Sequence, residues 1–137
     1  MERVIFACVH NAGRSQMAAA FLAMLSDPSR VEALSAGTQP GEQVHPIVVD
    51  VMKEAGVDIS GNRPQRLTRE LAEGASLLVT MGCGDECPFI PGLLRDDWPL
   101  PDPKDRPIAE VRAIRDEIRE RVSSLVASRG WHRHDRG

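Results

Sequence analysis

The sequence contains no tyrosine, few other aromatic residues, only three cysteines and no apolar run long enough to cross a bilayer. A small, odd number of cysteines argues against a framework of structural disulfides. The formal net charge of −3 gives no general reason to expect a nucleic-acid or membrane-surface partner. Because no secretory leader pattern precedes the first apolar segment, we expect a cytoplasmic protein.

What the sequence does contain is typical of a globular domain. Hydrophobic residues make up 42% and charged residues 27% of its 137 positions, which is enough for one domain with a real core. We expect a single domain over residues 1–128. The stretch "RGWHRHDRG" at 129–137 has no apolar face, so we expect a flexible tail there.

Apolar segments typical of buried strands alternate along the chain with amphipathic segments typical of helices. Strands are expected at 3–7, 31–35 and 76–81, and helices at 15–25, 46–56, 68–71 and 107–125. This order predicts a three-layer α/β/α domain around a parallel sheet. Ligands of such sheets bind beyond the carboxyl ends of the strands, and Cys8 is located at one of those ends.

The segment "CVHNAGRS" at 8–15 connects the first strand to the first helix, and its composition suits an oxyanion. A loop entering a helix directs several backbone N–H groups into one concavity, where the helix dipole adds positive charge. Gly13 permits a tight turn, and Arg14 offers a planar fork for two oxygens. The residues expected to surround the anion are Val9, His10, Asn11, Ala12, Gly13, Arg14 and Ser15.

The cysteine at the start of this loop is the candidate nucleophile. The positive field that holds an anion also stabilises a thiolate at Cys8, which would lie beneath the central atom of a bound tetrahedral oxyanion. Ser15 can donate its hydroxyl to the thiolate, and Asn11 can tie the loop together through its amide. His10 is interpreted as a loop-bracing or exposed residue, with general base as the alternative.

The loop "CVHNAGRS" resembles the phosphate-binding loop of the low-molecular-weight protein tyrosine phosphatase superfamily. Segments at 35–41, 44–60, 77–88, 97–103 and 114–122 resemble its arsenate reductase branch, so the likeness covers nearly the whole chain. The resemblance implies a four-stranded parallel sheet in the flavodoxin-like order 2-1-3-4, with the fourth strand near 94–98. It also implies that Asp102, which precedes a proline, is the general acid.

The same loop permits two chemistries. A low-molecular-weight phosphatase hydrolyses phosphomonoesters through a Cys8–phosphate intermediate, whereas an arsenate reductase forms a Cys8–arsenate adduct that a second thiol resolves, releasing arsenite. Two features favour the reductase. Without tyrosine the chain has little to form an aromatic wall for a phenyl ring, and Cys83 and Cys87 follow the third strand at the edge that holds Cys8. The phosphatase is the alternative. A non-catalytic anion-binding module would need neither the thiol nor Asp102.

The source of the second thiol is open between two mechanisms. The resemblance to thioredoxin-coupled reductases implies a relay through Cys83 and Cys87, although the paired cysteines of those enzymes are separated by six residues. The shorter Cys-x3-Cys spacing here resembles the reductases that use mycothiol, and an arginine-rich, lysine-poor composition suits an actinobacterial host that makes this thiol. In that case Cys8 alone carries the redox chemistry of the protein.

Cofactor and partner expectations follow from this chemistry. We expect no tightly bound cofactor, an arsenate, phosphate or sulfate ligand, and either mycothiol with its redoxin or thioredoxin as the reductant. Cys83 and Cys87 have zinc-ligand spacing but lack two further ligands, so no metal is expected. His45, which precedes a proline, is interpreted as a surface or loop-bracing residue.

Overall fold

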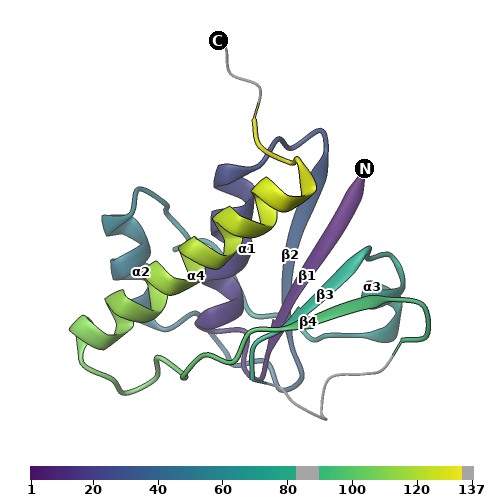
Figure 1. The fold of residues 1–137 in the computed structure, drawn as a ribbon. Helices are drawn as coiled ribbons and strands as arrows, with labels where there is room; N and C mark the ends of the chain where they lie inside the picture. Colours follow the sequence, from purple (N-terminus) through teal and green to yellow (C-terminus); the bar gives the residue numbers. More distant parts are fainter. Residues whose placement is uncertain (83–89, 134–137) are drawn as a thin grey trace.

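The computed structural model describes residues 1–82 and 90–133, which form one four-stranded sheet flanked by helices (Figure 1). In chain order the elements are β1 (Glu2–Cys8), α1 (Arg14–Leu25), β2 (Val31–Gly37), α2 (Pro46–Glu54), α3 (Arg69–Glu73), β3 (Leu77–Thr80), β4 (Leu94–Asp97) and α4 (Ile108–Arg129). All strand pairs are parallel, in the order β2-β1-β3-β4. The predicted fold class is therefore confirmed.

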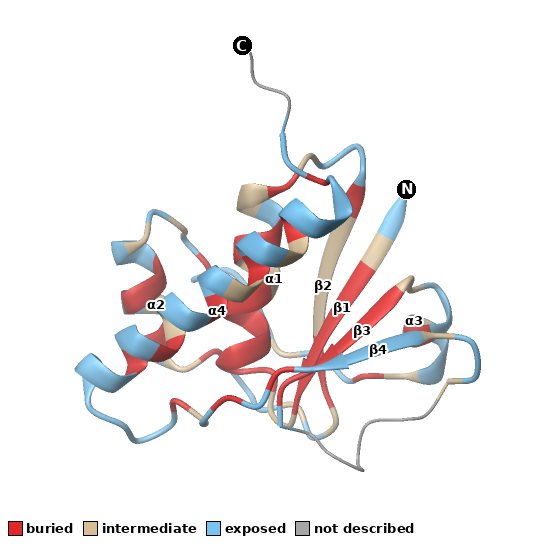
Figure 2. Ribbon diagram, in the orientation of Figure 1, coloured by how far each residue is buried: buried red, intermediate tan, exposed pale blue. Residues whose placement is uncertain are grey.

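The central strand β1 buries both of its faces, which explains its unbroken apolar sequence. Val4, Phe6 and Cys8 face the core that α1, α2 and α4 cover, whereas Ile5 and Ala7 face the smaller cluster under α3. Figure 2 shows buried residues along most of β1, along α1 and at intervals along α4. The alternation places the Cys8 side chain on the same side of the sheet as α1.

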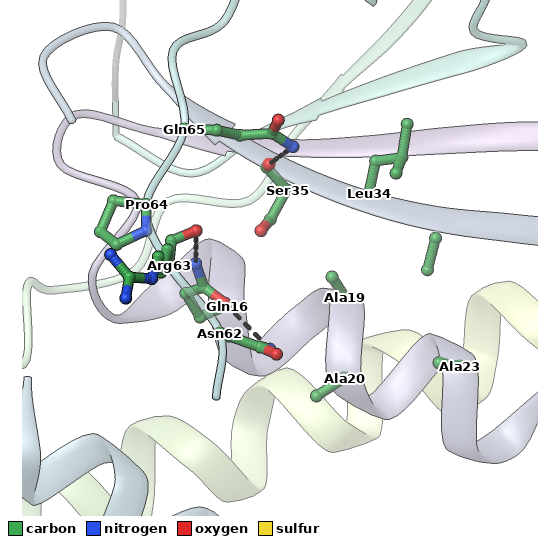
Figure 3. Close-up of a pocket in the computed structure, with 11 residues that line it drawn as sticks. Gln16, Ala19, Ala20, Ala23, Leu34, Ser35, Asn62, Arg63, Pro64 and Gln65 are labelled. Atoms are coloured by element: carbon green, nitrogen blue, oxygen red, sulfur yellow. Dashed lines mark hydrogen bonds between the residues drawn. The ribbon is translucent and has the colours of Figure 1, made fainter. Parts of the chain in front are cut away.

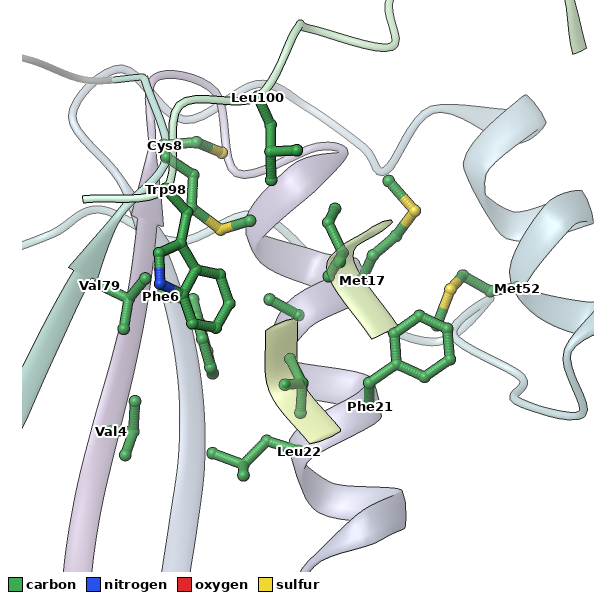
Figure 4. Close-up of a cluster of buried hydrophobic side chains, with 14 of the residues drawn as sticks. Val4, Phe6, Cys8, Met17, Phe21, Leu22, Met52, Val79, Trp98 and Leu100 are labelled. Carbon is green, nitrogen blue, oxygen red and sulfur yellow. The ribbon is translucent and has the colours of Figure 1, made fainter. Parts of the chain in front are cut away.

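Large side chains from the sheet and α1 fill the main core (Figure 4). Phe6 and Trp98 lie with ring centroids 5.6 Å apart in a tilted arrangement, and Met17 and Phe21 of α1 are fully buried beside them. Trp98 is therefore a packing residue. The core reaches the carboxyl end of β1, so the loop after Cys8 rests on a close-packed base.

Strand β4 has no periodic apolar signal, because all four of its residues are exposed. Backbone pairing with β3 holds it in place. Beyond its end the Trp98 backbone N–H donates to the Thr80 carbonyl oxygen at 2.8 Å. The expected position near 94–98 is confirmed, and it came from the family resemblance rather than from the pattern of residues.

Residues 129–133, the described part of the expected tail, pack against the domain. Helix α4 ends at Arg129, the C-cap residue Gly130 has φ 69°, and Trp131 packs against the core with only 3% of its surface exposed. Its indole N–H donates to the Glu2 carboxylate at 3.1 Å, and its carbonyl oxygen accepts from the Asp27 N–H at 2.7 Å. One large aromatic side chain thus anchors a segment whose composition is otherwise polar.

Within the parts of the chain that the structure describes, no helix combines the length and the apolar character that a membrane crossing requires.

Candidate active site

The loop between β1 and α1 presents the open N-terminus of a helix at the carboxyl edge of the sheet. β1 ends at Cys8 and α1 begins at Arg14, and Gly13 at the N-cap position provides no capping side chain. No acidic residue lies in the first turn of α1. Its N–H groups are therefore directed toward the loop, where an anion would find partial positive charge. The residues lining this cavity are Cys8, His10, Ala12, Gly13, Arg14, His45 and Asp102.

A chain of hydrogen bonds orients the hydroxyl hydrogen of Ser15 toward the sulfur of Cys8. The Gln65 backbone N–H donates to Asn11 Oδ1 at 2.9 Å, which turns the Asn11 amide nitrogen toward Ser15. That nitrogen donates to Ser15 Oγ at 2.7 Å, and Ser15 Oγ lies 2.9 Å from Cys8 Sγ. Since Ser15 Oγ accepts from Asn11, its own hydrogen is left for the sulfur of Cys8. A thiolate at this buried position thus receives a hydrogen bond.

Asn11 is held in an uncommon backbone conformation by several contacts. Its φ of 52° lies in the left-handed region, which asparagine adopts more readily than most residues. The side-chain amide of Gln16, a residue that sequence reasoning missed, donates to the Asn11 carbonyl oxygen at 3.0 Å. Gln16 is buried, whereas glutamines are mostly exposed. The only sequence signal is its position next to Ser15 in the first turn of the helix.

Arg14 lines the same pocket as Cys8 and is 7% exposed. Its Nη1 donates to the Leu100 carbonyl oxygen at 2.9 Å, which fixes the guanidinium plane. Its Nη2 lies 3.8 Å from Asp102 Oδ2. Gly82, with φ 103°, lets the backbone pass close to this group, since a Cβ there would collide with Arg14 Nη1. Any side chain at position 82 would displace the guanidinium.

Asp102 reaches the mouth of the pocket on a loop that closes over Gly13. A Cβ at position 13 would lie 2.7 Å from Pro103 Cγ, so only glycine allows this approach. The Lys104 backbone N–H donates to Asp102 Oδ1 at 3.0 Å, which orients the carboxylate. Side-chain exposure of 45% leaves Asp102 accessible to a ligand and to water. The structure therefore brings together Cys8, Arg14 and Asp102 from distant parts of the sequence.

Two histidines border the same cavity. His10 lies on the exposed side, with Nδ1 3.0 Å from the Gln39 carbonyl oxygen, a contact that braces the loop against the segment after β2. His45 precedes α2 and donates its backbone N–H to the Ala12 carbonyl oxygen at 2.9 Å. Burial lowers the pKa of His45 below its ordinary value of 6.5. The predicted roles of Cys83 and Cys87 concern residues outside the described parts of the chain.

A second cavity, about 520 Å³, lies beside α1 and β2 and is distinct from the thiol pocket (Figure 3). Alanine side chains form much of its lining, together with Leu34, Ser35 and the segment 62–65. It shares Gln16 with the loop network, where Asn62 Nδ2 lies 3.3 Å from Gln16 Oε1. No cysteine, histidine or carboxylate lines it. Its lining therefore offers no thiol nucleophile and no acid–base group for catalysis.

Comparison with known proteins agrees with this geometry. The model of the low molecular weight phosphotyrosine protein phosphatase family matches residues 3–132. The chain belongs to this family, and its fold and thiol loop are those that the resemblance implied.

Similar proteins within the family include reductases. A Halobacterium salinarum protein, named provisionally as an arsenate reductase, is 39% identical over 124 residues, which are 88% of this chain and 87% of that protein. The glutaredoxin arsenate reductase of a Synechocystis species is 32% identical over 130 residues, covering 93% of this chain and 98% of that one. The structure of a thioredoxin-dependent arsenate reductase from Corynebacterium glutamicum superposes with a TM-score of 0.81 at 41% identity. The match covers 93% of this chain and 61% of that longer one.

Proposed function

We propose that this protein is a thiol-dependent arsenate reductase. The observation that carries the proposal is the hydrogen-bond chain from Asn11 through Ser15 to Cys8, which prepares a buried thiolate at an anion-binding loop. Arg14 and Asp102 line the same cavity, where they would meet a bound oxyanion. The similarity to proteins named as arsenate reductases supports reduction of the oxyanion as the outcome.

The first step is attack of the Cys8 thiolate on the arsenic of bound arsenate. A sulfur–arsenic bond forms, and one arsenic–oxygen bond breaks. The departing oxygen takes a proton, for which Asp102 is placed at the mouth of the pocket, and leaves as water. Arg14 and the N-terminus of α1 stabilise the negative charge on the remaining oxygens. Arsenic is still pentavalent in this adduct.

The second step is attack of another thiolate on the Cys8 sulfur. A disulfide forms, the sulfur–arsenic bond breaks, and its electron pair stays with arsenic, which leaves as arsenite. Two thiols are thereby oxidised and one arsenic is reduced, so the electrons balance. A further thiol must then reduce the disulfide to return Cys8.

The thiol that attacks Cys8 in this second step is either mycothiol or a cysteine of the pair Cys83 and Cys87. The names of the relatives from Synechocystis and Corynebacterium glutamicum connect those proteins with glutaredoxin and thioredoxin, which supports a redoxin as the final reductant. The three-residue spacing between Cys83 and Cys87 favours mycothiol with its redoxin over an internal relay. Phosphatase activity toward phosphomonoesters is the second candidate function, since the family is defined by phosphatases and the same thiol loop suits it.

The experiment that tests the proposal supplies the full chain with arsenate and, in separate reactions, with mycothiol and its redoxin, with thioredoxin and with glutaredoxin. Arsenite is measured directly, and hydrolysis of p-nitrophenyl phosphate is measured beside it. We expect arsenite with at least one reductant and weak phosphatase activity, both lost in Cys8→Ser because a serine hydroxyl is a far weaker nucleophile. Efficient phosphatase turnover with no arsenite from any reductant would contradict the proposal.

A further inference from the structure

His45 has a place in the active site that its sequence context does not reveal. Its backbone N–H donates to the Ala12 carbonyl oxygen at 2.9 Å, which fixes the start of α2 against the anion loop. A Cβ at Gly13 would lie 3.7 Å from His45 Cδ2 and 2.7 Å from Pro103 Cγ. The imidazole and the Asp102-Pro103 turn therefore both lie beside Gly13. His45 lines the cavity, and its side chain accepts no capping hydrogen bond from the N–H groups of α2.

The charges around the pocket leave a divalent anion incompletely balanced. Arg14 provides the guanidinium charge of the cavity lining, and the Asp102 carboxylate, with Oδ2 3.8 Å from Arg14 Nη2, already offsets part of it. A tetrahedral oxyanion would add two negative charges next to the sulfur of Cys8. Taking up one proton near the ligand reduces this repulsion, and a histidine is the side chain that ordinarily does so near neutral pH.

The imidazole starts in the form that can accept a proton. Burial is the main cause that lowers the pKa of His45, and the charges of Lys104 and His10 act in the same direction. The carboxylates of Asp102 and Asp105 oppose them without reversing the shift. His45 is thus predominantly neutral at pH 7 when the pocket holds no anion. A divalent anion beside the ring favours the protonated form, as an additional carboxylate would.

We infer that His45 is an oxyanion-contacting residue that takes up a proton from solvent when a divalent oxyanion enters the pocket. The inference rests on the proposed function, because it assigns the bound anion to the loop that holds Cys8. It makes substrate binding dependent on pH through a residue outside that loop. The site should favour tetrahedral dianions, because a monoanion stabilises the protonated imidazole less than a dianion does.

The test uses sulfate, which remains a dianion across the pH range of interest and, unlike arsenate or phosphate, does not itself titrate there. The Cys8→Ser chain serves as the parent, so that the thiol adds no titration of its own. The His45 ring proton is followed by NMR from pH 5 to pH 8.5 with and without saturating sulfate, and is assigned by its loss in a His45→Gln variant. We expect sulfate to raise the titration midpoint by about one pH unit, which corresponds to about tenfold tighter sulfate binding at low pH than at high pH.

Matched variants separate His45 from its neighbours. His45→Gln should reduce the pH dependence of sulfate affinity to less than about twofold, whereas His132→Gln, remote from the pocket, should leave it unchanged. Asp102→Asn should retain the response, because the proton goes to the imidazole. An unchanged His45 midpoint with sulfate bound, or full pH dependence in His45→Gln, would overturn the inference.

The outcome is separable from that of the proposed function. A chain that shows the His45 response and makes no arsenite refutes the reductase and leaves the inference standing. An active reductase whose His45 ignores sulfate refutes the inference alone.

Discussion

At the residue scale, the orientation of the Asn11 amide determines that the Ser15 hydroxyl donates its hydrogen to Cys8. Asn11 receives a backbone N–H from Gln65 and so must present its NH₂ to Ser15. Ser15 can then donate only toward Cys8. A buried chain of hydrogen bonds is sensitive to any substitution that turns one of its donors into an acceptor.

Asn11→Asp tests this chain with almost no change in shape. The carboxylate accepts from both Gln65 and Ser15, so the Ser15 hydrogen turns away from Cys8 and a negative charge lies beside the thiolate. We expect arsenate turnover to fall at least about 100-fold, the size of effect seen when a hydrogen-bond donor to an anion in an active site is lost. Alkylation of the Cys8 peptide by iodoacetamide, followed by mass spectrometry, should be slower than in the parent under the same conditions.

Ser15→Ala is the companion variant, since it removes the donor without adding charge. It should show the same direction of change and a smaller effect on alkylation. Parental alkylation in Asn11→Asp would show that the hydrogen bond from Ser15 does not stabilise the thiolate.

Arg14→Lys keeps the charge in the pocket but removes the planar fork. An ammonium has no rigid planar fork that could contact two oxyanion oxygens while another donor of the same group holds the Leu100 carbonyl oxygen. We expect kcat/KM for arsenate to fall about 100-fold or more, with circular dichroism unchanged. Kinetics within a few fold of the parent would show that Arg14 supplies only charge.

Cys83 and Cys87 separate the two mechanisms for the second thiol. If mycothiol attacks the Cys8 adduct, the double variant Cys83→Ser/Cys87→Ser should keep at least about half of the arsenite production with mycothiol and its redoxin. We expect this result because neither sulfur is then on the path. If the relay is internal, the same variant should stop thioredoxin-driven turnover after one event. Sulfate binding equal to that of the parent would show that the variant is folded.

At the scale of elements, an ion-pair cluster connects α2 to α4. Glu54 accepts from Arg112 at 2.7 and 3.0 Å and from Arg115 at 2.8 Å. Hydrogen bonding from Arg112 is the main cause that lowers the pKa of Glu54 to about 2. The cluster is exposed, so salt screens it and its contribution to stability is modest.

The pH dependence of this cluster has a definite sign. Because the folded pKa of Glu54 is depressed, its contribution is present above pH 4.5 and is lost as the pH falls toward 2. Glu54→Gln should therefore lower the thermal unfolding midpoint at pH 6, and the difference from the parent should shrink progressively between pH 4.5 and pH 2.5. Glu120→Gln, at an exposed position of α4, controls for the loss of one negative charge. A difference that is constant with pH would contradict the assignment.

The elements also show where sequence reasoning succeeds. The strand–loop–helix order around residues 2–25 is local, so the pattern of apolar residues located Cys8 and Arg14 correctly. β4 is an edge strand of four exposed residues, and no periodicity marks it. His45 lines the same pocket as Cys8, although it follows Cys8 by 37 positions in the sequence. The Leu100 carbonyl oxygen binds Arg14 across a separation of 86 positions. Local patterns carry no information about such pairs.

At the scale of the whole molecule, the two ends of the sheet serve different purposes. The carboxyl edge holds the thiol pocket, and at the amino edge Trp131 closes the core against Glu2. The tail composition concealed this anchor because one tryptophan among polar residues forms no periodic face. Arg129 also lies over the Trp131 ring, 5.6 Å from its centroid.

Trp131→Ala should destabilise the fold without changing the active site. Removing a buried tryptophan costs about 3–5 kcal/mol, and relaxation of the nearby chain end favours the lower value. Trp131→Phe keeps most of the packing and loses the bond to Glu2, so it should cost about 1 kcal/mol. Urea unfolding measures both, and arsenate kinetics at 20 °C should match the parent. A Trp131→Ala chain as stable as the parent would contradict the anchoring role.

The contact between Glu2 and Trp131 also determines how the molecule can be attached to something else. β1 runs for seven residues from Glu2 to Cys8, so both described ends of the chain lie about 20 Å from the edge that holds the thiol. A solid support, a fluorescent label or a fused redoxin joined at either end would leave the pocket facing open solution. The same proximity would let a short peptide join the chain near Glu2 to the chain near Trp131, so that new termini could be opened in an exposed turn elsewhere.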